Sequence, residues 1–140
     1  MITEIDLKQA VQRQLTAAFN IPCYGMDMKE GLKKPAFFVQ MVVATTETVN
    51  IQTMAAEFFI NYLQKKTDEK DALNAAIKIR QLFIPKIKVK HRKLTVENYA
   101  YSYIGKNGDL MRISFDINFM QQKPKPLTKP IREVKIRMEE

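Results

Sequence analysis

The stretch Leu110–Met120, LMRISFDINFM, alternates strictly between two kinds of side chain. Successive side chains of a β-strand point to opposite faces of the sheet, so this pattern predicts a strand with one packed face and one wet face. Such a strand is typical of an antiparallel sheet with a core on one side only. The packed parity is Met111, Ile113, Phe115, Ile117 and Phe119, and the wet parity is Arg112, Ser114, Asp116 and Asn118.

The residues before this stretch supply its partner strand. Val96–Ile104 has strand composition, and the loop Gly105–Asp109 that follows contains an Asn-Gly turn signal. We therefore expect an antiparallel hairpin. Three tyrosines share one face of its first strand, and both packing within the sheet and an aromatic contact between subunits fit them. They are Tyr99, Tyr101 and Tyr103.

A second hairpin is predicted earlier in the chain. Ala36–Val43 is apolar on both parities, which indicates a strand that is buried on both faces or covered by another subunit. The strand from about Val49 to Leu63 has a continuous apolar face, and the polar segment Thr45–Thr48 joins the two strands. That apolar face consists of Met54, Ala56, Phe58, Ile60 and Tyr62.

Two amphipathic helices flank the second hairpin. Thr3 and Asp6 have the spacing of a capping box at the start of the first helix. Thr67 or Asp68 caps the second helix, and Pro85 ends it. The predicted buried side chains are Leu7, Val11, Leu15, Ala18 and Phe19 in the first helix, and Leu73, Ala76, Ile77 and Phe83 in the second.

The predicted order is α-β-β-α-β-β-β, with the alternating segment Lys86–Lys90 as the first of the last three strands. The fold class is α+β, a mostly antiparallel sheet with two helices packed on one face. Residues 1–122 form this domain, and residues 123–140 form a basic C-terminal arm with three of the six prolines. Neither a membrane helix nor a secretory signal is apparent, and a single cysteine excludes an internal disulfide, so we expect assembly in a reducing cytoplasm.

The net charge of +8 is shared between the body and the arm, because residues 121–140 carry six Lys/Arg and three Asp/Glu. The body is only mildly basic, which predicts at most weak, non-specific contact with nucleic acid and no membrane partner. Within the arm, Val134, Ile136 and Met138 alternate with Lys135 and Arg137. This pattern predicts a strand that pairs with a sheet edge of its own or of a neighbouring subunit once the protein is assembled.

The densest basic run spans residues 86–93. Lysines on an edge strand prevent wrong strand pairing, and the same side chains also suit a polyanion or an acidic neighbour. Both interpretations stay open. The run contains Lys86, Lys88, Lys90, Arg92 and Lys93, and the candidate subunit contacts are Tyr99, Tyr101, Tyr103, Arg112, Asp116, Val134 and Ile136.

The sequence contains no recognisable catalytic constellation. His91 is the only histidine and lies among basic residues, and Cys23 has neither a second cysteine nor a nearby histidine to activate it. The four glycines form no phosphate-binding loop. We therefore expect a non-enzymatic protein without cofactor or metal.

The layout resembles the tail terminator proteins of long-tailed bacteriophages and of phage-derived tail-like particles. The similarity lies in the first helix, the pieces Ile21–Gly25 and Pro35–Val39, the hairpin to Phe58–Ile60, the Asp68–Phe83 helix and the tyrosine-bearing last hairpin. It spans about residues 2 to 120. The basic, proline-rich arm departs from the compact form of such proteins.

This resemblance implies a structural ring, typically a hexamer, that caps the tail tube, ends its polymerisation and offers a surface for head–tail joining. The implied partners are other copies of the chain, the tail tube protein and a head–tail connector protein, in the tail of a virion or prophage-derived particle. Another head–tail connector or tail-completion protein is the alternative within phage assembly. A basic nucleic-acid-binding regulator is the alternative outside it.

Overall fold

The computed structural model describes residues 1–25 and 33–124. Its helices are α1 (Glu4–Phe19) and α2 (Glu69–Phe83), and the strands are β1 (Cys23–Tyr24), β2 (Ala36–Glu47), β3 (Ile51–Leu63), β4 (Lys86–Val89), β5 (Arg92–Ile104) and β6 (Leu110–Gln122).

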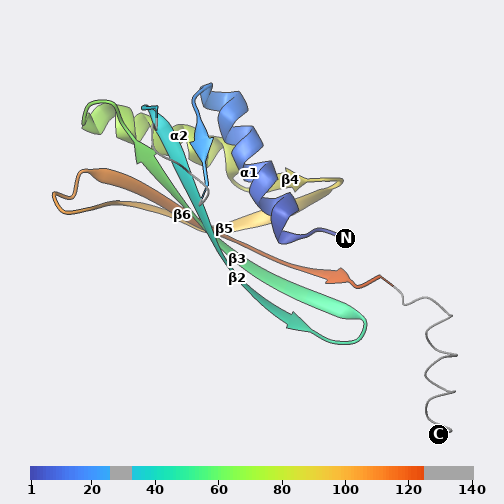
Figure 1. Cartoon of the computed structure of the whole chain (residues 1–140). Helices are drawn as coiled ribbons and strands as arrows, with labels where there is room; N and C mark the ends of the chain where they lie inside the picture. The colour runs from blue at the N-terminus through green and yellow to red at the C-terminus, as the bar shows by residue number, and fades with distance from the viewer. Residues whose placement is uncertain (26–32, 125–140) are drawn as a thin grey trace, which may run out of the picture.

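The strands form one curled sheet in the order β1-β2-β3-β6-β5-β4. Only the short β1 runs parallel to its neighbour; the other pairs are antiparallel. Both helices lie on the same side of the sheet, and the far ends of β2, β3 and β6 project beyond them (Figure 1). The predicted α+β class is confirmed.

The core lies between the helices and the facing side of the sheet. Phe115 is fully buried at its centre, with ring centroids 5.3 Å from Phe58 and 5.4 Å from Phe83. All predicted inward positions of β3 and β6 are buried, which confirms both alternation patterns. They are Met54, Ala56, Phe58, Ile60, Tyr62, Met111, Ile113, Phe115, Ile117 and Phe119.

The start of α1 is fixed locally and by the sheet. Thr3 and Asp6 form the predicted capping box, in which the Asp6 carboxylate accepts from the Thr3 N–H at 2.8 Å. That hydrogen bond holds the pKa of Asp6 below its usual value. The amide of Gln121 in β6 bonds both the N–H and the carbonyl of Ile2, at 2.9 and 2.7 Å, and also reaches Gln52 at 2.8 Å.

One prediction about burial is wrong, and another is narrowed. Ile77 is 39% exposed, because α2 turns the stripe Ala72, Ala75, Ala76, Ile79 and Phe83 toward the sheet. The second face of β2 is buried at Ala36 and half-buried at Phe38, but Val42 is 59% exposed. Of the two predicted alternatives, burial on both faces therefore fails along the rest of β2 within the described residues, and cover by another subunit stays a prediction.

In β5 the residues that face the helices change from even-numbered to odd-numbered positions, and a register irregularity is the reason. The β5–β6 pairing shifts between Glu97 and Ala100, where Asn98 adopts a left-handed conformation with φ 55°. Such a bulge places one extra residue in its strand. Even-numbered Leu94 and Val96 face the helices before it, and the odd-numbered tyrosines do so after it.

Candidate assembly surfaces

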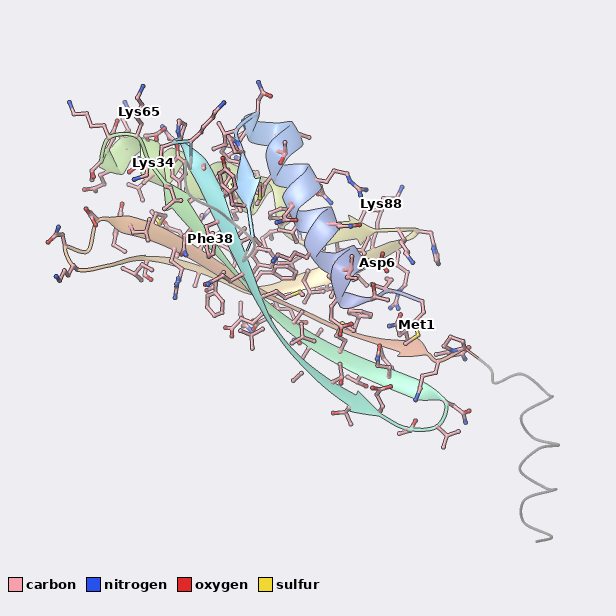
Figure 2. All side chains as sticks on the ribbon, viewed as in Figure 1. Met1, Asp6, Lys34, Phe38, Lys65 and Lys88 are labelled. Atoms are coloured by element: carbon pink, nitrogen blue, oxygen red, sulfur yellow. The ribbon has the colours of Figure 1, made fainter. Side chains whose placement is uncertain are left out.

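The sheet face away from the helices is open among the described residues. Figure 2 shows Phe38 on this side of β2, opposite to α1. Arg112 lies on the same face two strands away, where its Nε donates to the Asn61 side chain at 2.9 Å and its guanidinium covers the Phe59 ring at 5.3 Å. Two contacts within the chain therefore position the Arg112 side chain, and its role as a subunit contact stays a prediction.

Three acidic side chains line up across the open face. The registers place Glu57 of β3 opposite Asp116 of β6, and Asp116 opposite Glu97 of β5. We call Glu57, Asp116 and Glu97 the acidic row. The Asn98 amide, next to Glu97 in the chain, donates to the Asp116 carboxylate at 2.8 Å. The row ends beside a shallow depression lined by Val42, Ala44, Ala55, Glu57, Asp116 and Asn118. Sequence reasoning found only Asp116, because the row exists only once the strands are in register.

The predicted basic run is divided between two sides of the sheet. Lys88 of β4 pairs directly with Lys93 of β5, and Lys86 follows on the same face, so these three exposed side chains form what we call the lysine face. Arg92 points to the other side, where it covers the Phe119 ring and donates to the Met120 carbonyl at 3.0 Å. Lys90 lies in the turn and its ammonium pairs with the Asp6 carboxylate at 3.2 Å.

The three tyrosines do not share one role. Tyr99 is half-buried, and its hydroxyl donates to the Ala76 carbonyl, which ties β5 to α2. Burial raises the pKa of Tyr99 to about 12, so it stays neutral and keeps this bond. Tyr101 and Tyr103 are 42% and 41% exposed beyond it. They remain candidates for contact with another subunit, whereas Tyr99 packs within its own chain.

The projecting ends of the strands carry apolar side chains. Val49 at the tip of the β2–β3 hairpin is 83% exposed, and Met120 of β6 is 58% exposed. Lys123 closes this end, because its N–H donates to the Asn50 carbonyl at 2.8 Å and its ammonium pairs with Glu47 at 3.3 Å. The described residues therefore end at the tip of the β2–β3 hairpin. Val134 and Ile136 lie outside the described residues.

Comparison with known proteins identifies this architecture. Residues 6–129 match the sequence model of a phage tail terminator protein family. The chain belongs to this tail terminator family. The suspected resemblance is thereby confirmed over nearly the whole domain.

Structural comparison agrees with the family assignment at the level of the fold. A chain of the virion of a native gene transfer agent (GTA) particle superposes with a TM-score of 0.58 at 16% identity, covering 84% of this chain and 95% of its own. A second solved chain reaches a TM-score of 0.47 at 8% identity, covering 91% and 100%, and carries no inference. No curated protein sequence matches.

The terminator is a structural, non-enzymatic component of a phage tail. Within residues 1–25 and 33–124, no group of three His, Cys, Asp or Glu has the geometry of a metal site, and no helix is both long and apolar enough to cross a membrane. Burial raises the pKa of the Cys23 thiol to about 11, so the reactive thiolate is scarce at neutral pH.

We expect the variant that combines His91→Ala with Cys23→Ser to assemble like the natural terminator. His91 is exposed in the turn after β4, and Cys23 is half-buried in β1, so neither has the partners that catalysis needs. Particle formation by the double variant checks this expectation. Failure to assemble in a variant that keeps its melting temperature would point to a functional site at one of these residues.

Binding of the free terminator to duplex DNA is expected to be weak and to fall steeply with salt. The lysine face offers only three cations in one place, which limits the number of phosphates it neutralises. Titration of labelled DNA at several salt concentrations measures this. Sub-micromolar, sequence-selective binding at physiological salt would support the regulator hypothesis instead.

Proposed function

We propose that the terminator assembles in the bacterial cytoplasm into a ring, a hexamer, that caps the tail tube and ends its polymerisation. The exposed side of the ring then offers the docking surface for the head–tail connector protein. The observation that carries this proposal is the family match over residues 6–129. Interaction with the tail tube follows from the family; the ring, its copy number and the connector are our proposal.

The surfaces of the chain suit a ring because they are chemically different from one another. A closed ring forms through heterologous contacts, in which one patch of a subunit meets a different patch of the next. The lysine face lies on β4 and the start of β5, and the acidic row crosses β3, β6 and the middle of β5. The two patches have opposite charge, so they are complementary between copies. Tyr101, Tyr103 and Arg112 add the aromatic and arginine side chains that are enriched at interfaces.

The ring is tested on the purified full chain alone and with purified tube protein. Native mass spectrometry is expected to give one closed oligomer of six copies, and electron microscopy is expected to show density from this protein at tube ends only. A charge reversal, Lys88→Glu, is expected to weaken the oligomer, and the additional change Asp116→Lys to restore part of it. A chain that stays monomeric with tube protein, or that coats tubes along their length, would contradict the proposal.

A further inference from the structure

Beyond its short pairing with β1, the outer edge of β2 has no strand partner among residues 1–25 and 33–124. β1 pairs only with Phe37 and Phe38, and no other described residue pairs with β2 on that side. We call the remaining stretch, residues 39–47, the β2 edge. It contains no proline, no glycine and no bulge, and its first charged residue is Glu47. Edge strands usually carry such features because an open edge pairs with other chains.

The direction of the free backbone groups follows from one hydrogen bond. The Phe37 N–H donates outward to the Pro22 carbonyl at 2.9 Å. Hydrogen-bonding direction alternates along a strand, so Val39, Met41, Val43 and Thr45 also point their N–H and C=O groups away from β3. These N–H and C=O groups can form the hydrogen bonds of one additional β-strand.

The opposite edge of the sheet is better protected. β4 is four residues long and alternates lysine with buried apolar residues. β5 continues past it, but its free part begins with Glu97 and the irregularity that ends at Ala100. Charges and bulges are the usual means by which edges avoid pairing. Of the two edges, the β2 edge therefore has fewer features that prevent pairing with an added strand.

Apolar side chains flank the β2 edge on both faces. On the helix side, a groove beside α1 and β2 is lined by Glu4, Ile5, Lys8, Gln9, Gln12, Gly25 and Met41. Ile5 is 67% exposed there, although it lies on a helix that packs on the core. On the open side Val42 is 59% exposed. An added strand with one apolar side would cover Ile5 and Met41.

Residues 131–138, which lie outside the described residues, have a sequence that suits this position. Val134, Ile136 and Met138 share one parity, and Glu133, Lys135 and Arg137 share the other. With the apolar side chains against α1, the charged side chains fall on the open face, two strands away from Glu57 of β3. Eight residues of strand span about 26 Å at 3.3 Å each, close to the length of the nine-residue β2 edge.

The segment that connects the body to residues 131–138 favours the β2 edge of a neighbouring copy over that of the same chain. Lys123 is fixed at Glu47 and Asn50, at the end of β2 itself. Residues 124–130 include Pro124, Pro126 and Pro130, and proline-rich spacers of seven residues extend by about 22 Å. Pairing with the β2 edge of the same chain would require this stiff spacer to reverse direction at once. An extended spacer instead carries the strand outward from the hairpin tip.

We propose that residues 131–138 of each terminator add as an extra strand to the β2 edge of the neighbouring copy. This proposal rests on the self-assembly proposed above and gives it a partner segment and an acceptor. Each subunit donates one strand and receives one, which is a heterologous contact that closes a ring. The main-chain hydrogen bonds supply affinity, and the alternate apolar side chains set the register.

Disulfide cross-linking between singly labelled chains tests this arrangement. All chains carry Cys23→Ser, so that each has only the cysteine introduced for the test. Chains with Thr45→Cys are mixed with chains that carry Val134→Cys, Ile136→Cys or Met138→Cys, and each mixture is mildly oxidised after assembly. At least one mixture is expected to give linked dimers, several-fold more than the matched mixture with Lys135→Cys, whose side chain falls on the other face. Because each chain has one cysteine, a mixed link joins two copies.

The other outcomes overturn the proposal in distinguishable ways. A link within one chain carrying both Thr45→Cys and Ile136→Cys, without links in the mixtures, places the arm on its own β2. If the arm cysteines link to Ser102→Cys on β5 in preference to Thr45→Cys, the arm pairs with the β5 edge of the sheet instead. Closed rings without either link refute the arm contact and leave the proposed ring intact. A chain that remains monomeric refutes both proposals.

An edge-blocking variant gives an independent test. Thr45→Pro removes an outward N–H without removing a bond to β3, so the melting temperature is expected to change little. Self-association measured by sedimentation should nevertheless fall several-fold, while Thr45→Ala leaves it unchanged. Normal association of a folded Thr45→Pro variant would overturn the proposal.

Discussion

The variant Leu15→Ala is expected to lose about 2–5 kcal/mol of the free energy of unfolding, the range for removing a fully buried leucine. Leu15 is inaccessible to solvent in the layer between α1 and the sheet. Its replacement leaves a cavity that the surrounding side chains fill only in part. Urea unfolding followed by circular dichroism measures the loss.

The matched control for this prediction lies on the same helix. Ile5→Ala also removes aliphatic carbon atoms, but Ile5 is 67% exposed in the free chain, so its effect is expected to stay below about 1 kcal/mol. Equal stability losses in the two variants would show that α1 packs through a different face from the one described.

Removal of residues 124–140 is expected to separate folding from assembly. Lys123 stays in this variant because it bonds Asn50 and pairs with Glu47, so the hairpin tip remains closed. The melting temperature should therefore match that of the full chain, whereas self-association or docking should weaken strongly. Sedimentation velocity and thermal unfolding of the same samples measure the two effects.

The truncation also removes the charged residues of the arm, so a second variant that keeps these charges serves as its control. Replacing Val134, Ile136 and Met138 by serine keeps the arm's length and its charge but removes its apolar parity, and it should weaken association similarly. If the truncated terminator forms the same oligomer and still ends tails, the arm is dispensable and its proposed role fails.

Much of the fold was predictable because period-two patterns report which face of a strand is buried. The alternation in residues 110–120 predicted the inward side of β6, and the even positions of residues 54–62 predicted that of β3; both are confirmed. The capping box at Thr3 and the cap at Asp68 mark the helix starts through local hydrogen bonds. Local chemistry was sufficient for each of these features.

Features that depend on pairing between distant segments were not predictable. Ile77 was assigned to the core because it is apolar, yet the rotation of α2 is set by the sheet beneath it. The acidic row needs the registers of three strands, and the separation of Arg92 from the lysine face needs the β4–β5 turn. The open β2 edge likewise appears only when the order of strands is known.

The length of tails in particles that lack this protein tests the central claim most directly. A terminator that caps the tube should be needed both to stop tube growth and to join the head. Electron micrographs of the deletion are therefore expected to show tubes of variable, excessive length without heads, and supplying the natural chain should restore uniform, joined tails. Tails of normal length attached to heads in the deletion would contradict the account.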